Sequence, residues 1–126
     1  MKILTPRIHG ILDFVVVALF ALAPTLFGLS GTTATISYAL AVIHLILTLT
    51  TAFPYGILKL IPFTVHGALE VVVSILLLLA PWIFGFAAED NAKMFYIGSG
   101  ILIFIVYLTT DYKAAEADPA SHARTA

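Results

Sequence analysis

The chain contains no cysteine and few charged residues, and both shortages exclude classes of function. Its 126 residues include six Lys plus Arg and seven Asp plus Glu, for a formal net charge of −1. Without cysteine the chain has no disulfide, no thiolate metal site and no cysteine nucleophile. Without a basic stripe it lacks the electrostatic footprint of a nucleic-acid-binding protein. We therefore expect no nucleic acid as a partner and no thiol chemistry.

Apolar residues are abundant instead. They make up 61% of the chain, charged residues make up 10%, and the mean hydropathy is +1.08. An ordinary soluble domain is roughly 25% charged. At this length the chain has room for one compact unit, and a water-soluble unit of this size could not bury so many apolar side chains. The composition predicts a lipid bilayer as the surrounding solvent.

The longest apolar run spans residues 65–86, VHGALEVVVSILLLLAPWIFGF, and Glu70 is its single acid. A bilayer core of roughly 30 Å needs about 20 apolar residues, because each helical residue adds about 1.5 Å. Residues 65–86 are therefore predicted to form a membrane-spanning helix.

This run has a second copy near the N-terminus. Residues 8–29, IHGILDFVVVALFALAPTLFGL, align without gaps on residues 65–86 at an offset of 57, and 11 of the 22 positions are identical. Residues 49–53 correspond in the same way to residues 108–112, at an offset of 59. Self-similarity of this kind indicates an internal repeat. The sequence thus predicts two copies of a two-helix unit.

The predicted fold is all-α, a transmembrane four-helix bundle made of two tandem duplicated helical hairpins. Because each repeat contains two helices, the halves are expected in parallel topology, related by a pseudo-twofold axis along the membrane normal. The helices are expected near residues 8–28, 35–53, 64–86 and 93–111. A single membrane domain is expected over residues 1–112, with repeat 1 at about 6–54, repeat 2 at about 63–112 and a polar, partly frayed tail at 113–126.

The first apolar run also has features of a secretory signal peptide, since Ala21-Leu22-Ala23 looks like a cleavage site. Pro24 would directly follow the cut, and Asp13 interrupts the apolar region. The run is moreover one half of the repeat. We therefore expect it to be retained as the first membrane helix.

The positive charges predict how the bundle is oriented. An even number of spans places both termini and the middle loop on the same side of the membrane. That side carries five positive residues against one on the other side: Lys2, Arg7, Lys59, Lys113 and Arg124 against Lys93. Positive residues favour the cytoplasmic side, so both termini are expected in the cytoplasm.

Each repeat carries the pattern Leu-Ala-Pro-x-x-Phe-Gly late in its first helix, with Pro24 and Gly28 in one copy and Pro81 and Gly85 in the other. A proline there removes a backbone hydrogen bond and bends or ends the helix, and the following Phe-Gly allows a turn. Trp82 suits a membrane interface, because its ring is apolar and its edge polar. We interpret these residues as a helix-end motif with an aromatic anchor.

At residues 80–86, APWIFGF, the chain resembles the SPW-repeat family of small integral membrane proteins. Members of that family have one or two copies of a two-helix unit that carries Ser-Pro-Trp followed by Gly-Phe. The resemblance covers about residues 8–112. This chain departs from the motif in having Ala80 in place of Ser, and its first copy, Ala23-Pro24-Thr25, lacks the Trp. The family has no established biochemical activity, so the resemblance implies an architecture.

Ionisable residues inside the apolar runs gather near one end of the predicted bundle. Asp13 follows His9 by four residues, and Glu70 follows His66 by four, so each pair shares a helix face at roughly 6 Å. The pseudo-twofold axis would bring the two pairs to the same depth, near the cytoplasmic end. The candidate polar cluster comprises His9, Asp13, His66, Glu70, His44, which lies deeper, and Asp111.

Two interpretations of this cluster are open. Ionisable groups at mid-membrane cost about 2.5 to 3.5 kcal/mol each on insertion scales, and they usually face a partner or a water-filled cavity. The cluster is either a proton, ion or ligand site, or a set of contacts that holds the helices in register. In the second case each carboxylate accepts from a histidine, Arg7 or a threonine hydroxyl, or extends toward the nearby interface.

Two histidines on separate helices also raise the possibility of a haem, although each precedes a glycine in the first helical turn near the boundary. There is no nucleophile–base pair, phosphate loop or H-x-x-x-H spacing, so we expect no enzyme, no cofactor and no metal. The leading hypothesis is a non-enzymatic multi-pass membrane protein, a structural or accessory subunit that packs with itself or with larger membrane partners. The alternatives are a small transporter or proton-coupled channel that uses the cluster, and a haem- or quinone-binding membrane protein.

Overall fold

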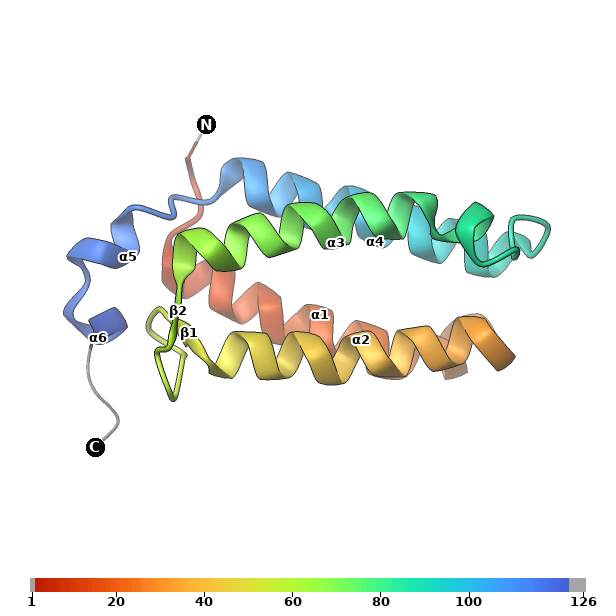
Figure 1. Ribbon diagram of the computed structural model, residues 1–126, viewed down its shortest axis with the longest axis horizontal. Helices are drawn as coiled ribbons and strands as arrows, with labels where there is room; N and C mark the ends of the chain where they lie inside the picture. Colours follow the sequence, from red (N-terminus) through yellow and green to blue (C-terminus); the bar gives the residue numbers. More distant parts are fainter. Residues whose placement is uncertain (1, 123–126) are drawn as a thin grey trace.

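The computed structural model describes residues 2–122 of the chain. Four long helices run side by side, and the N- and C-terminal segments lie at the same end of the bundle (Figure 1). We call this the terminal end and the opposite one the loop end. The elements are α1 (Pro6–Phe27), α2 (Gly31–Leu49), β1 (Thr51–Ala52), β2 (Ile61–Pro62), α3 (Phe63–Ile83), α4 (Asp90–Thr109), α5 (Ala114–Ala117) and α6 (Pro119–His122).

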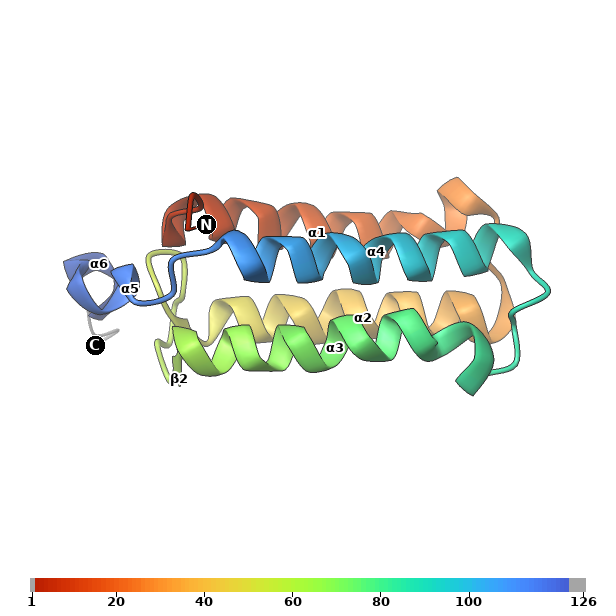
Figure 2. The same ribbon diagram turned by 90° about the horizontal axis from the view of Figure 1, so that it is seen from above.

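Helices α1 to α4 are each long and apolar enough to cross a bilayer, which confirms the predicted number and character of the long helices. Helix α1 packs mainly against α2, and α3 packs mainly against α4. The two hairpins also meet along α1 and α4, which lie next to each other when the bundle is viewed from above (Figure 2). The chain is therefore arranged as two hairpins packed into one bundle.

The ends of α1 follow from local chemistry. The Thr5 hydroxyl accepts a hydrogen bond from the Ile8 N–H at 3.2 Å, and Pro6 occupies the first turn, where no backbone donor is needed. Helix α1 continues past Pro24 to Phe27 and stops at Gly28, whose φ of 65° is left-handed. Gly85 after α3 has a φ of 76°. A glycine therefore makes the turn in both hairpins, since a side chain would strain that conformation.

The second helix of each hairpin begins earlier than predicted, at Gly31 and at Asp90. The Ser30 N–H donates to the Thr33 hydroxyl at 3.3 Å, which satisfies a backbone donor at the start of α2. Asp90 places negative charge in the first turn of α4, where the helix dipole favours it. Polar residues expected in the loops therefore form the first turns of these helices.

The same two helices also end earlier than predicted, so the helical prediction for Thr51 and Thr110 is wrong. β1 pairs with β2 in parallel, with Thr51 opposite Ile61. Thr110 makes an isolated parallel bridge with Leu4. Backbone groups of the neighbouring segments thus replace the last helical hydrogen bonds at the terminal end.

Among residues 2–122, buried apolar side chains form two clusters. The larger lies between α1, α2, α3 and α4 and includes Phe20, Leu77 and Tyr96. The smaller, at the terminal end, comprises Phe53, Phe63, Tyr112 and Ala115. Apolar side chains also cover the outside of the bundle; exposed examples are Leu22, Leu26, Val42, Ile46, Val72 and Ile101.

The polar tail predicted for residues 113–126 contains two short helical turns, α5 and α6, packed at the terminal end of the bundle. Residues 123–126, including Arg124 of the predicted charge bias, lie outside the described part of the chain.

Candidate functional site

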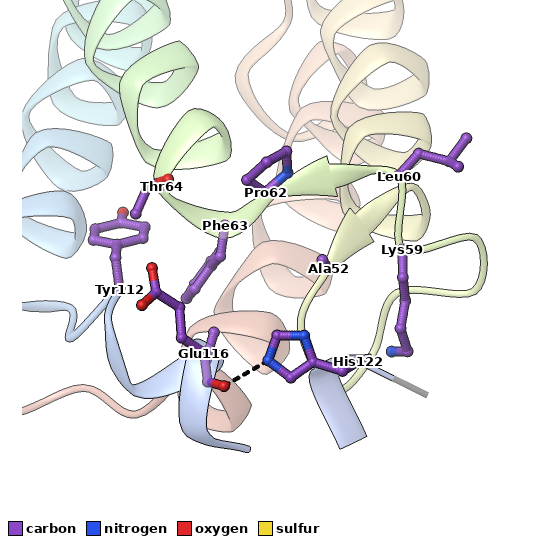
Figure 3. A pocket seen from close by; sticks show the side chains of 10 residues that line it. Ala52, Lys59, Leu60, Pro62, Phe63, Thr64, Tyr112, Glu116 and His122 are labelled. Atoms are coloured by element: carbon purple, nitrogen blue, oxygen red, sulfur yellow. Dashed lines mark hydrogen bonds between the residues drawn. The ribbon is translucent and has the colours of Figure 1, made fainter. Parts of the chain in front are cut away.

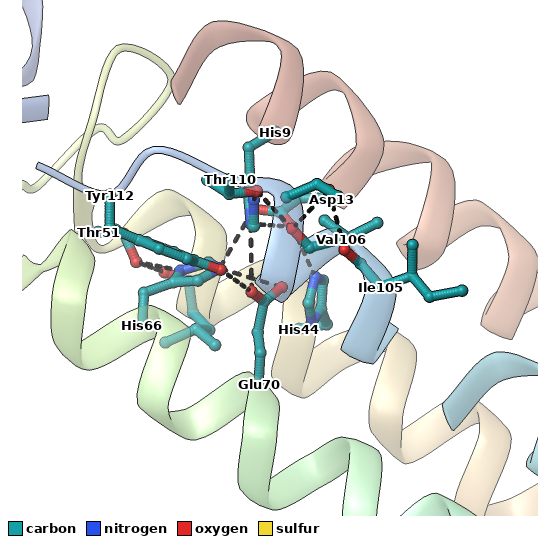
Figure 4. A network of polar contacts seen from close by, with 12 residues as sticks. His9, Asp13, His44, Thr51, His66, Glu70, Ile105, Val106, Thr110 and Tyr112 are labelled. Atoms are coloured by element: carbon teal, nitrogen blue, oxygen red, sulfur yellow. Dashed lines mark hydrogen bonds and ion pairs between the residues drawn. The ribbon is translucent and has the colours of Figure 1, made fainter. Parts of the chain in front are cut away.

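A polar cluster lies inside the bundle near the terminal end. His9 and Asp13 project from α1, and His66 and Glu70 project from α3 toward them (Figure 4). None of these four residues is more than 3% exposed. The structure thus places the two predicted His/acid pairs together and excludes them from the surface, so neither acid extends toward the interface.

Each histidine faces both acids. His9 Nε2 lies 3.2 Å from Asp13 Oδ1 and 3.3 Å from Glu70 Oε2. His66 Nε2 lies 3.4 Å from Asp13 Oδ2 and 3.5 Å from Glu70 Oε1. The two pairs therefore form one ionic network that joins α1 to α3, and the charge state of any member affects the other three.

His44 of α2 belongs to the same network. Its Nε2 lies 3.2 Å from Asp13 Oδ1, in hydrogen-bonding geometry. The sequence placed His44 deeper than the other histidines, and a helix projection does not show that its side chain reaches Asp13. Asp13 therefore contacts three histidines, one from its own helix and two from others.

Tyr112, which follows the end of α4, is a member that the sequence reasoning missed. Its hydroxyl donates to Glu70 Oε2 at 3.0 Å. Burial, together with the neighbouring Glu70 carboxylate, raises the pKa of Tyr112 well above its ordinary value. The phenol therefore stays protonated and acts as a hydrogen-bond donor.

Two threonine hydroxyls contact the Nδ1 atoms of His9 and His66. His9 Nδ1 lies 2.8 Å from Thr110 Oγ1, and His66 Nδ1 lies 2.8 Å from Thr51 Oγ1. Each histidine thus contacts the threonine that follows the second helix of the other hairpin. Both threonines lie in the matching segments 49–53 and 108–112, but the sequence did not indicate that they contact the histidines.

The glycine after each histidine leaves room for aromatic rings. A Cβ added to Gly67 would lie 2.7 Å from the Tyr112 ring, and one added to Gly10 would overlap Tyr55 and approach Phe53. These rings cover the terminal side of the cluster. In each His-Gly dipeptide the histidine therefore supplies a polar side chain, and the glycine lets an aromatic ring lie close to the helix backbone.

Other predicted residues lie elsewhere. Asp111 lies outside the cluster, and its Oδ1 accepts from the Ala114 N–H at 3.2 Å. Arg7, considered as a partner for the acids, lies with its Nη2 3.6 Å from Asp118 Oδ2 at the surface. These two charged residues thus stabilise the tail.

The helix-end motif of Pro24, Gly28, Pro81, Trp82 and Gly85 lies at the loop end, far along the helices from the cluster. The Trp82 side chain is exposed, and Lys93 Nζ lies 5.9 Å from the centre of its ring. The motif and the cluster thus occupy opposite ends of the bundle.

A cavity of about 230 Å³ opens at the terminal end, next to the cluster (Figure 3). Its lining includes Phe63, Thr64, Tyr112, Glu116 and His122. The Tyr112 ring therefore faces this cavity while its hydroxyl contacts Glu70. Tyr112 thus connects the lining of the cavity to Glu70.

The arrangement can hold protons or a small cation, because it combines two carboxylates with histidine nitrogens in an enclosed space. A haem fits poorly. The rings of His9 and His66 are 5.3 Å apart, and carboxylate oxygens occupy the region that both Nε2 atoms face, which leaves no gap for a porphyrin.

Comparisons with protein-family models, with curated proteins and with solved structures find no match for this chain.

Proposed function

We propose that this chain is a non-enzymatic integral membrane protein, a structural or accessory subunit whose four helices span the bilayer. The observation that carries the proposal is the distribution of polarity. Apolar side chains cover the outside of α1 to α4, whereas five ionisable residues inside the bundle are buried against one another: His9, Asp13, His44, His66 and Glu70. Charged groups in a bilayer face partners rather than lipid, so this inside-out pattern suits a bundle in lipid.

The proposal includes a duplicated architecture, in which residues 6–54 and 63–112 are copies in parallel topology. Contacts at equivalent positions support it. The His9–Thr110 and His66–Thr51 contacts are equivalent under the 57- and 59-residue offsets. At the loop end the Leu29 N–H bonds the Pro24 carbonyl and the Phe86 N–H bonds the Pro81 carbonyl. This pattern is also consistent with membership of the SPW-repeat family.

Topology reporters test the membrane part of the proposal. A reporter that is active only in the cytoplasm, fused to either terminus, should be active, because the positive residues favour that side. The same reporter inserted in the short loop after Gly28 should be inactive. An inactive C-terminal fusion, with normal expression, would contradict the four-span arrangement with cytoplasmic termini.

The accessory role is tested by purification in mild detergent with mass measurement of the intact particle. We expect particles heavier than one chain, either oligomers of this chain or a complex with a larger membrane protein. Strictly monomeric particles with a substrate-dependent activity would overturn the role.

A second candidate, a small transporter or proton-coupled channel, is favoured by one observation. The Tyr112 hydroxyl contacts Glu70 and the same side chain lines the terminal cavity, so Tyr112 connects the cluster to a space at the terminal end. Proton or cation flux into liposomes should then fall when Asp13→Asn and Glu70→Gln are combined. Asp111→Asn, which changes an acid outside the cluster, is the matched control. Equal flux in all three proteins and in empty liposomes would eliminate transport.

A further inference from the structure

We propose that His9, His66, Asp13 and Glu70 form a binding site for one divalent transition-metal ion of the Zn²⁺ type. One ligand atom from each of the four residues lies within 4.8 Å of the others. All four residues are buried. The inference concerns the chemistry of the cluster and holds whatever partners the bundle has.

The threonines determine which histidine nitrogen is available. The Thr110 hydroxyl donates its proton to the Val106 carbonyl at 2.6 Å, and the Thr51 hydroxyl donates to the Leu47 carbonyl at 2.6 Å. Each hydroxyl has one proton, so its oxygen must accept from the histidine. His9 and His66 therefore both carry a proton on Nδ1. Nε2 is the nitrogen left to bind a proton or a metal.

Both of these Nε2 atoms lack a hydrogen-bond partner within residues 2–122, although each is completely buried. Carboxylate oxygens lie 3.2 to 3.5 Å away, yet none is aligned with the ring as a hydrogen bond requires. Each nitrogen thus lies close to an oxygen of both acids without a hydrogen bond to either. A cation bound by the four residues would give both nitrogens the partner that they lack.

The distances suit a tetrahedral ion. Zinc lies about 2.0 to 2.1 Å from histidine nitrogens and carboxylate oxygens, which separates neighbouring ligand atoms of a tetrahedron by about 3.3 Å. His66 Nε2 lies 3.4 Å from Asp13 Oδ2 and 3.5 Å from Glu70 Oε1, and the full set of four ligand atoms lies within 4.8 Å of one another. Two nitrogens and two oxygens are a ligand set that zinc and other divalent first-row metals accept.

A second layer of residues orients the ligands. His44 bonds Asp13 Oδ1, which leaves Oδ2 without a hydrogen-bond partner among the described residues. Tyr112 bonds Glu70 Oε2, so Oε1 is left to face His66. Thr51 and Thr110 set both histidine tautomers. Each ligand therefore has its own outer partner, as metal sites in proteins usually do.

The charges balance when the site is filled. Two carboxylates and two neutral imidazole rings around a dication form a neutral cluster, so no net charge is buried where low-polarity surroundings would penalise it.

The test is a Zn²⁺ titration of the full-length protein purified in detergent after treatment with a chelator. Calorimetry measures the stoichiometry of binding. We expect one ion per chain, and a higher midpoint of thermal unfolding with Zn²⁺ than without. Absence of saturable binding by the folded protein would overturn the proposal.

Variants locate the site. Asp13→Asn combined with Glu70→Gln keeps the shapes of the side chains and should abolish binding. Glu116→Gln combined with His122→Gln changes groups at the terminal cavity and should leave the stoichiometry at one. Unchanged binding in the first variant, or loss of binding in the second alone, would overturn the assignment.

A spectroscopic measurement covers the case in which the cluster variant fails to fold. Co²⁺ added to the metal-free wild-type protein should give the intense visible bands of a tetrahedral nitrogen-and-oxygen site, and Zn²⁺ should then abolish them. Only the weak bands of octahedral, hydrated Co²⁺ would contradict the enclosed site.

Discussion

The two ends of the bundle join the hairpins by different means. At the terminal end, five ionisable side chains contact one another across α1, α2 and α3, and Tyr112 joins them from beyond α4. At the loop end, apolar packing predominates, with single hydrogen bonds such as that from the Tyr96 hydroxyl to the Thr33 carbonyl at 2.6 Å. Polar contacts are directional, so the terminal end specifies how the hairpins align, while the loop end supplies packing.

The difference matters more in lipid than it would in water. Lipid tails are as apolar as the side chains of the loop end, so apolar burial alone does little to drive helix association there. Buried polar groups must find partners, because an unpaired one is costly in an apolar medium. We therefore expect substitutions at the terminal end to have the larger effects.

The largest effect is expected for Asp13→Ala, which removes the carboxylate that three histidines share. The change should lower the free energy of unfolding in detergent by about 3 to 5 kcal/mol, because it leaves buried partners uncompensated. Asp111→Ala, at the same end and outside the cluster, is the control and should cost no more than about 1 kcal/mol. Denaturation followed by circular dichroism measures both. Equal small losses would mean that the network contributes little to alignment.

A double-mutant cycle of Asp13→Asn and Glu70→Gln, measured as free energies of unfolding, tests whether the two acids act together. The double variant should cost less than the sum of the single variants, since the two acids share both histidines and act as one unit. Simple additivity would contradict a shared site.

Tyr112→Phe should lower stability at neutral pH by about 2 kcal/mol, because Glu70 loses a donor to its charged oxygen. It should also alter the pH dependence. The folded pKa of Tyr112 lies above its unfolded value, so the stability from the neutral phenol is complete below about pH 10 and declines as pH rises from there toward the folded pKa. When the free energy of unfolding is measured against pH, it should fall less steeply at alkaline pH in the variant than in the wild-type protein. Identical slopes would contradict the burial of this hydroxyl.

Thr51→Val and Thr110→Val should each cost about 1 to 2 kcal/mol, because a buried histidine N–H loses its acceptor. The two losses should be similar, since the contacts are equivalent. The neighbours Thr50 and Thr109, whose hydroxyls bond carbonyls of their own helices, provide matched controls. Their valine variants should be nearly neutral in the same unfolding assay. A loss confined to one hairpin would show that the histidines are not held equivalently.

Effects no larger than those at Thr51 and Thr110 are expected at the loop end. Gly28→Ala and Gly85→Ala should cost about 1 to 2 kcal/mol each, because both glycines have positive φ while nothing crowds the missing side chain. Asn, which tolerates this conformation, should cost less at both positions. A loss for Asn as large as that for Ala would indicate a steric cause instead of a conformational one.

Much of this organisation could be predicted from the chain alone. The four long helices follow from apolar runs of spanning length, and the placement of His9 beside Asp13 follows from the helical repeat. Contacts between helices could not be predicted in the same way, because they depend on how each helix is rotated. His44 illustrates this limit: Ile103 stands at the equivalent place in the second repeat, so the repeat gave no indication that His44 reaches Asp13.

The non-helical backbone of the residues after α2 and α4 was not predicted, for another reason. Thr51 and Thr110 extend apolar stretches that look helical, yet their backbones pair with Ile61 and Leu4. Pairing with a segment distant in sequence overrides local helix preference at these positions. Tyr112 follows the same departure from the helix, and that is why its contact with Glu70 was not anticipated.

The exchange of threonines between the hairpins bears on how such a chain could arise. His9 in the first hairpin needs Thr110 of the second, and His66 in the second needs Thr51 of the first. A hairpin alone would leave its histidine without that acceptor, whereas two identical hairpins facing each other would satisfy both. The two histidine–threonine contacts have the pattern that a symmetric dimer of two hairpins would make. Under the proposed duplication, the segment between β1 and β2 would join two such hairpins in one chain, and each could then change independently, as His44 opposite Ile103 illustrates.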